Sequence, residues 1–443
     1  MARLAVVGLW HLGCVAAAAL AKLGHTVRAT DFDAEAVRKL QQGIPPVYEP
    51  GLAELIAQQV QAGGLSFVTP CAEAFAGAAH VFITFDTPVD DNDESDLTPI
   101  LSAVDAIAEH APSGTAVVVM SQVPVGTCQQ LAERLRARAP QRSFRLVYHP
   151  ENLRLGEALR TFLEPDFLLV GAEQEAEADR LLALYASISA PRLKMSTHSA
   201  ELAKHALNAF LATSISFVNE LANLAEACGA DVRDVVRALR QDRRIGPHAF
   251  LNPGPGFSGG TLGRDIQTLR QLGATTGRRT LQLDATLAVN RERLPYLVET
   301  LRQACGRLRG IRVGLLGLTY KPGTNTLRRS HALALAHRLL QAGTEVRAYD
   351  PQIREPRPET VGLTLCADAY QAAESADALL VVTPWPEFKS LDWGRLRRTM
   401  RQPALIDAHN CLDDRAARHA GLHYFGTGVP SNTPRHKQKG AAS

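Results

Sequence analysis

Hydrophobic positions in the first part of the chain form short β-branched runs separated by longer alanine-rich or amphipathic stretches. The run RLAVVG (3–8) predicts a strand, GCVAAAALAKLG (13–24) a helix that ends at its last glycine, and HTVRATDFD (25–33) a second strand ending in an acid. Further apolar runs predict strands at AHVFITF (79–85), TAVVVM (115–120) and FRLVYHP (144–150). This alternation is typical of a mostly parallel sheet that begins with the βαβ unit of a dinucleotide-binding fold.

The same pattern occurs again after a long helical segment. We predict that residues 199–228 form that helix and that it ends at Gly229. IRVGLLGLTYKPGT (311–324) then starts a second α/β unit, whose helix SHALALAHRLLQAG (330–343) precedes the strand TEVRAYDP (344–351). We therefore predict an α/β fold with two Rossmann-like, doubly wound parallel-sheet domains, joined by the long central helix and a helical middle domain. The expected boundaries are 1–195 for the dinucleotide-binding domain, 196–300 for the central helical domain, 301–430 for the C-terminal Rossmann-like domain and 431–443 for a disordered tail.

Composition narrows the range of partners. The 443 residues are too many for one ordinary core, and a formal net charge of +3 is too small to favour nucleic acid or a membrane surface. No apolar run reaches the roughly 18 residues of a membrane span, and the N-terminus fits a first strand better than a signal peptide. Seven cysteines are scattered without a CxxC pair or a metal-binding spacing, which predicts reduced thiols, a cytoplasmic protein and no metal site.

The first predicted turn carries an imperfect dinucleotide fingerprint. Gly8 and Gly13 match the first and third glycines of G-x-G-x-x-G. Asp31 stands about 20 residues on, where an acid binds ribose hydroxyls and disfavours a 2′-phosphate. Trp10 occupies the middle position, where glycine normally lets a pyrophosphate approach the backbone. The turn alone therefore favours equally an NAD-binding domain and a Rossmann domain that no longer binds a dinucleotide.

A second group of candidate residues lies in the middle of the chain. Lys204 and Asn208 are four residues apart on the predicted helix and share a face, and a lysine beside an amide suits stabilisation of a developing oxyanion. The alternative is a solvated polar stripe. GPGFSGGTLGRD (254–265) is the densest glycine run, which is typical of a loop that brings backbone amides close to a ligand. Arg244 fits either an anion contact or a surface charge.

Several longer motifs, which follow one another along the chain in the family's order, make the chain resemble the UDP-glucose/GDP-mannose dehydrogenase family. The most specific are ELAKHALNAFLATSISFVNE (201–220) and PGPGFSGGTLGRD (253–265). The others are PPVYEPGL (45–52), SQVPVGT (121–127), HPENLRLG (149–156), RIG (244–246), GLTYKPGTNTLRRS (317–330), YDP (349–351) and TPWPEF (383–388). The resemblance implies NAD-dependent oxidation of a nucleotide sugar at C6, with UDP-glucose as the default substrate.

The resemblance also implies roles for individual residues. Lys204 would stabilise the alkoxide or oxyanion with Asn208 beside it, and Asp265 would take part in proton transfer with a water. Glu151 matches a glutamate of the family's Pro-Glu motif. The implied ligand sites are Gly8, Trp10, Gly13, Asp31, Thr87 and Thr127 for the cofactor, and Arg244, Gly256, Phe257, Gly259, Lys321 and Arg328 for the nucleotide sugar. Arg244 would reach the ligand of a neighbouring subunit, so a homodimer is expected.

One residue of the glycine loop departs from the family pattern. The family's loop carries a cysteine that attacks the intermediate aldehyde, and Thr261 occupies that position here. A thiol with a pKa of about 8.5 is partly ionised near neutral pH, whereas an alcohol is not. Three functions stay open: complete oxidation to the acid by unusual chemistry, oxidation that stops at the aldehyde, and binding of a nucleotide sugar without catalysis.

Overall fold

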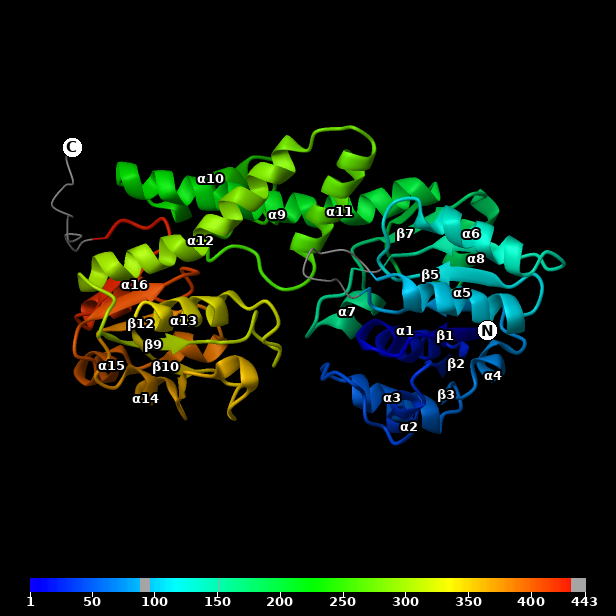
Figure 1. The fold of residues 1–443 in the computed structure, drawn as a ribbon, viewed down its shortest axis with the longest axis horizontal. Coiled ribbons are helices and arrows are strands. Elements are labelled where there is room, and N and C mark those ends of the chain that lie inside the picture. The colour runs from blue at the N-terminus through cyan, green and yellow to red at the C-terminus, as the bar shows by residue number, and fades with distance from the viewer. Residues whose placement is uncertain (88–95, 151, 432–443) are drawn as a thin grey trace. The chain divides into compact units, whose positions relative to one another are not determined.

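The computed structural model describes residues 1–87, 96–150 and 152–431 (Figure 1). The chain divides into two compact units, Met1–Leu207 and Asn208–Ser443. None of the helices in these described ranges has the length and apolar character needed to cross a bilayer. The predicted disordered tail, apart from Ser431, lies outside the described residues.

The first unit is built on an eight-stranded sheet with the order β3-β2-β1-β4-β5-β6-β7-β8. Neighbouring strands are parallel except β6 and β7, which pair antiparallel. The strands are β1 (Arg3–Val7), β2 (Thr26–Thr30), β3 (Leu65–Phe67), β4 (His80–Ile83), β5 (Ala116–Val119), β6 (Arg145–Tyr148), β7 (Leu168–Ala172) and β8 (Arg192–Met195). The helices are α1 (His11–Lys22), α2 (Ala34–Gln41), α3 (Leu52–Gln61), α4 (Cys71–Phe75), α5 (Thr98–His110), α6 (Thr127–Arg138), α7 (Ala158–Leu163) and α8 (Glu175–Ala183). All the strands predicted in this part of the chain are present.

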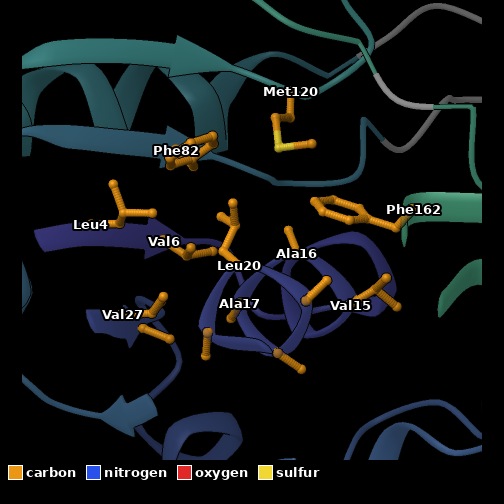
Figure 2. Packing of buried hydrophobic residues seen from close by; sticks show 14 of the residues in the cluster. Leu4, Val6, Val15, Ala16, Ala17, Leu20, Val27, Phe82, Met120 and Phe162 are labelled. Carbon is orange, nitrogen blue, oxygen red and sulfur yellow. The ribbon is translucent and has the colours of Figure 1, made fainter. Parts of the chain in front are cut away.

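Helix α1 packs closely on this sheet because its buried side chains are mostly small. Every residue from Leu12 to Ala21 is buried. In Figure 2, Leu20 of α1 lies beside Val6 of β1, within one hydrophobic cluster. Gly13 makes the approach possible, because a Cβ at this position would lie 1.7 Å from the carbonyl oxygen of Gly8.

A long helix, α9 (Thr197–Cys228), starts in the first unit and continues into the second. It confirms the predicted central helix, and Gly229 follows its last residue with a φ of +77°. The helices that come after it in the chain are α10 (Val232–Gln241), α11 (Leu262–Thr275) and α12 (Leu281–Cys305).

The second unit carries a six-stranded sheet with the order β11-β10-β9-β12-β13-β14, in which all neighbours are parallel. Its strands are β9 (Arg312–Leu316), β10 (Glu345–Tyr349), β11 (Thr364–Leu365), β12 (Ala378–Val381), β13 (Ala404–Asp407) and β14 (His423–Gly426). Its remaining helices are α13 (His331–Gln341), α14 (Ala369–Ala373), α15 (Trp393–Thr399) and α16 (Asp414–His419), with short 3₁₀ turns at Pro358–Thr360 and Pro386–Ser390. Two Rossmann-like sheets and the intervening helices confirm the predicted fold class.

Candidate functional site

The turn after β1 has the backbone geometry of a dinucleotide fingerprint. Gly8 has a φ of +101°, and a Cβ there would lie 2.8 Å from the Phe85 nitrogen, so glycine is required. Asp31, directly after β2, accepts hydrogen bonds from the Leu9 nitrogen at 2.5 Å and the Asp33 nitrogen at 3.0 Å. These two bonds engage different carboxylate oxygens, and each oxygen has capacity for a second donor. Asp31 therefore has the acceptor capacity to bind ribose hydroxyls.

The Trp10 side chain does not occupy the interior of the turn between β1 and α1. It is the N-cap of α1, with φ −88° and ψ −152°, an extended conformation that does not require glycine. Its side chain is 51% exposed and makes no capping hydrogen bond. Because an indole carries a hydrogen-bond donor and no acceptor, it does not compete with an anion for the N–H groups in the first turn of α1.

Two aromatic residues beside this turn belong to none of the sequence motifs. The rings of Phe32 and Phe85 are stacked, with centroids 5.6 Å apart and planes 8° apart. Phe32 directly follows Asp31 and is 47% exposed, so the pair offers a flat apolar surface next to the carboxylate. Thr87 lies two residues beyond Phe85, and its hydroxyl donates to the carbonyl oxygen of Gln122 at 2.9 Å.

Glu201 on α9 anchors the start of α6. Its carboxylate accepts from the Gly126 nitrogen at 2.6 Å and from the Cys128 nitrogen at 2.8 Å. A carboxylate at a helix N-terminus satisfies free N–H groups and complements the helix dipole. Thr127, the first residue of α6, is buried between these two donors.

Lys204 lies one turn further along α9 and is only 6% exposed. Its Nζ donates to the side-chain oxygen of Asn152 at 3.0 Å. The alternative of a solvated polar stripe is therefore wrong for Lys204, and Glu201, one turn before it on α9, is fully buried as well. Glu151, the neighbour of Asn152, lies outside the described residues.

A buried carboxylate connects the start of α1 with the segment that precedes α7. Glu49 is 3% exposed and accepts from His11 Nε2 at 2.8 Å, from the Gly156 nitrogen at 2.9 Å and from the Ala158 nitrogen at 2.8 Å. The only sequence signal is its place in PPVYEPGL, which does not reveal these partners.

The second unit brings two more predicted residues into direct contact. Asn208 donates from its side-chain amide to the carboxylate of Asp265, which is completely buried in the first turn of α11. The Arg264 guanidinium lies 3.5 Å from the other carboxylate oxygen. A guanidinium and the positive end of the helix dipole both stabilise negative charge at this position.

Thr261 is exposed and directly precedes α11, but its side chain does not cap the helix. Earlier in the same loop, Gly256 has a φ of +93° and Gly259 a φ of +78°. The Phe257 side chain is buried in a hydrophobic cluster with Ile266 and other residues.

The predicted cationic residues of the second unit lie at or near the surface. Arg244 is highly exposed, and its guanidinium is held by Asp242, with Nη2 2.6 Å from a carboxylate oxygen. Lys321 is half-buried, with its Nζ 5.8 Å from the centre of the Tyr320 ring. Arg328 is exposed.

The acid of the second Rossmann-like sheet is engaged differently from Asp31. Asp350 is completely buried, and its Oδ2 accepts from the backbone of Leu318, from the backbone and hydroxyl of Thr319 and from the Trp385 indole. This carboxylate therefore stabilises its own turn. Among the described residues, no cluster of three His, Cys, Asp or Glu side chains has a metal-binding arrangement.

Three family models match the chain in sequence. They are the NAD binding domain, over residues 2–189, the central domain, over 198–292, and the UDP binding domain, over 314–414, of the UDP-glucose/GDP-mannose dehydrogenase family. The UDP-glucose 6-dehydrogenase of Pseudomonas aeruginosa is 36% identical, over 97% of this chain and 98% of that protein. This chain belongs to the UDP-glucose/GDP-mannose dehydrogenase family.

Further relatives extend the similarity over nearly the whole length. The UDP-glucose 6-dehydrogenase of Rhizobium meliloti is 35% identical, over 97% of this chain and 100% of that protein. The solved structure of a UDP-glucose dehydrogenase from the archaeon Pyrobaculum islandicum is 34% identical, with a TM-score of 0.89 over 97% of this chain and 98% of that one.

The three matched regions divide the candidate residues. The family's NAD binding domain includes the fingerprint turn and Asp31, and its central domain includes Lys204, Asn208 and the glycine loop. Its UDP binding domain includes Lys321 and Arg328. Family membership confirms the resemblance drawn from the motifs.

Proposed function

We propose that this protein is an NAD-dependent dehydrogenase that oxidises the C6 hydroxyl of a UDP-sugar. UDP-glucose is the first substrate to test, because relatives from P. aeruginosa and R. meliloti are UDP-glucose 6-dehydrogenases. One observation carries the proposal: the buried Asp265 carboxylate is held by the Asn208 amide at the start of α11. A carboxylate that is shielded from solvent and fixed in orientation suits proton transfer at a bound substrate.

The proposed chemistry assigns one task to each polar group. The hydroxyl proton passes through a water to Asp265, whose orientation is set by Asn208. The Lys204 ammonium, held by Asn152, stabilises the negative charge that develops on the alkoxide oxygen. NAD⁺, when bound, accepts the hydride that leaves C6. Glu151 belongs to the same proposed group of catalytic residues.

The residues around the β1 turn fit a bound NAD. In the proposal, Gly8, Gly13 and the first turn of α1 hold the pyrophosphate, and Asp31 accepts hydrogen bonds from the adenosine ribose. An acid at this position repels a 2′-phosphate, which favours NAD over NADP. The proposed contacts nearer to the nicotinamide come from Thr87 and Thr127.

We assign the nucleotide sugar to the glycine loop and the C-terminal domain. Gly256, Phe257 and Gly259 place the loop backbone beside the sugar, and Lys321 and Arg328 bind the diphosphate, whose charge they match. This assignment keeps the proposed division into a cofactor domain (1–195), a central domain (196–300) and a nucleotide-sugar domain (301–430).

A second candidate function is oxidation that stops at the aldehyde. Thr261 offers only a hydroxyl, and the complete loop 254–265 contains no cysteine. Burial raises the pKa of the Cys14 and Cys305 thiols to about 12, so these two thiols are poor substitutes. The first hydride transfer needs Lys204, Asn208 and Asp265 but no thiol, so one oxidation step is compatible with this loop.

We further propose that the active form is a homodimer in the cytoplasm. Phe210, Phe217 and Leu224 follow one another at intervals of seven on α9 and are 72%, 50% and 60% exposed. Large apolar side chains repeated on one face of a helix favour packing against a second copy of the chain. The highly exposed Arg244 would then reach the partner's substrate. All seven cysteines are free, as expected in a reducing compartment.

The decisive experiment counts NADH formed per sugar consumed when the purified protein is incubated with NAD and UDP-glucose. Two NADH per sugar support complete oxidation to the acid, and one supports arrest at the aldehyde. No NADH with any of a panel of UDP- and GDP-sugars, together with calorimetric binding of UDP-glucose, would establish a binding protein in place of an enzyme.

A further inference from the structure

Side chains of two helices hold the backbone of the glycine loop on both sides of Pro255 and Gly256. The Gly254 nitrogen donates to Asn219 Oδ1 at 2.8 Å, and the Gly254 oxygen accepts from Arg293 Nε at 3.1 Å. The Phe257 nitrogen donates to Asn290 Oδ1 at 2.8 Å, and the Phe257 oxygen accepts from Asn290 Nδ2 at 3.0 Å. We call Asn219 of α9 and Asn290 and Arg293 of α12 the loop clamp.

The clamp also explains why glycine stands at position 256. A Cβ on Gly256 would lie 2.3 Å from Asn290 Oδ1 and 3.2 Å from Arg293 Cγ. Its φ of +93° is moreover one that side-chain-bearing residues rarely adopt. The absence of a side chain at this position therefore lets two α12 residues approach the loop.

Burying the Arg293 guanidinium costs desolvation free energy, which is unfavourable for a residue that only supports the fold. It is 1% exposed, and burial lowers the pKa of its guanidinium. Its Nη1 donates to Asn223 Oδ1 at 2.8 Å, while its Nη2 is buried without a hydrogen-bond partner among the described residues. An apolar side chain would avoid this desolvation cost, but it would lose the link from α12 to the Gly254 carbonyl.

We propose that Asn219, Asn290 and Arg293 are positioning residues that hold the loop at 254–257 in its substrate-binding conformation before the nucleotide sugar arrives. A loop fixed in advance loses less conformational entropy on binding, so the affinity for the ligand is higher. By fixing residues 254–257, the clamp also fixes the point from which the chain continues through Thr261 to Asp265. The inference rests on the proposed function for the identity of the ligand.

The test compares Arg293→Met and Asn290→Ala with the wild type, and uses Arg302→Met as a matched control. Arg302 lies on the same helix and pairs locally with Glu299 at a partly exposed position. Hydrogen exchange of peptides covering 254–265 is measured without ligand, together with the KM for UDP-glucose, the Kd for NAD and the Tm.

We expect amide exchange in the loop to become at least tenfold faster in both clamp variants and the KM for UDP-glucose to rise at least tenfold. The Kd for NAD and all values of Arg302→Met should stay within a factor of two of the wild type. Arg293→Lys, which keeps one donor near Gly254, should recover part of the KM.

Unchanged loop exchange in both clamp variants would overturn the inference, whatever the protein's substrate. So would a loss of protection spread evenly over α9, α12 and the loop, because that is the result of a general structural role. A wild type that neither oxidises nor binds UDP-glucose would instead overturn the proposed function, while its loop exchange would still decide whether the clamp holds the loop.

Discussion

The side-chain amide of Asn208 donates to the carboxylate of Asp265, which lies 57 residues further along the chain. Asp265 is completely buried and also close to the Arg264 guanidinium. The contact joins a residue of the long helix α9 to the first turn of α11, directly after the glycine loop. Two residues selected from separate motifs thus occupy one polar cluster inside the second unit.

Asp265→Asn should remove proton transfer while keeping the shape of the side chain. We expect kcat to fall by about 10²- to 10⁴-fold, the usual contribution of a general base, while the KM for UDP-glucose changes less than about threefold. Steady-state NADH formation measures both. Asp284→Asn, at a partly exposed position on α12 that pairs with Arg270, is the control. A kcat within threefold of the wild type would remove Asp265 from the mechanism.

Trp10→Gly tests whether the indole obstructs the cofactor. Because the ring is half-exposed and makes no capping hydrogen bond, we expect the wild type to bind NAD with a Kd below about 1 mM. The substitution should change this Kd by less than tenfold. Calorimetry with NAD measures both values. Absence of binding in the wild type, with binding gained in Trp10→Gly, would show a blocked site.

The sequence predicts the fold well because the relevant signals are local. Alternating β-branched and alanine-rich runs locate five strands of the first sheet, namely β1, β2, β4, β5 and β6, and Gly229 marks the end of α9. The antiparallel pair in the described part of the first sheet, β6 with β7, has no such local signal, because the pairing direction depends on how the segment between the two strands returns the chain to the sheet.

The candidate site is predictable only in part, for the same reason. Motifs identify residue types, but the partners of a buried polar group come from distant segments. Glu49 accepts a hydrogen bond from the nitrogen of Gly156, which is 107 residues away in the sequence. Asn290 accepts one from the nitrogen of Phe257, which is 33 residues away. Asp31 and Asp350 look equivalent in sequence, yet Asp350 is fully enclosed by donors of its own unit.

Thr261→Cys should allow the second oxidation if the wild type stops at the aldehyde. The residue is exposed and directly precedes α11, and a helix N-terminus lowers the pKa of a thiol. We expect the ratio of NADH formed to sugar consumed to rise from one to two, as measured by absorbance and product chromatography. Thr261→Ser, which keeps a hydroxyl, should leave the ratio at one. A ratio of one in Thr261→Cys would mean that the loop does not bring this position to the aldehyde.

Phe217→Glu should separate the proposed dimer. A carboxylate in the centre of the exposed apolar stripe on α9 would have to be buried without a partner, which opposes association. Size-exclusion chromatography with light scattering should show twice the chain mass for the wild type and a single chain for the variant. Val361→Glu, at an exposed apolar position outside α9, should stay dimeric. A monomeric wild type would contradict the proposal.

His331 should make the protein less stable as the pH falls below neutrality. Burial lowers its pKa from 6.5 to about 4, whereas unfolding returns the ring to its ordinary value. Between these two values the unfolded state binds a proton that the folded state excludes, so the free energy of unfolding falls as the pH falls through this window. From pH 7 to pH 5 this residue lowers the free energy of unfolding by about 2 kcal/mol.

Urea unfolding at both pH values measures this loss of stability. The loss should be correspondingly smaller in His331→Gln, while His423→Gln, at an exposed position, should behave as the wild type. An identical pH dependence in the wild type and His331→Gln would mean that the ring is protonated in the folded protein as readily as in the unfolded chain.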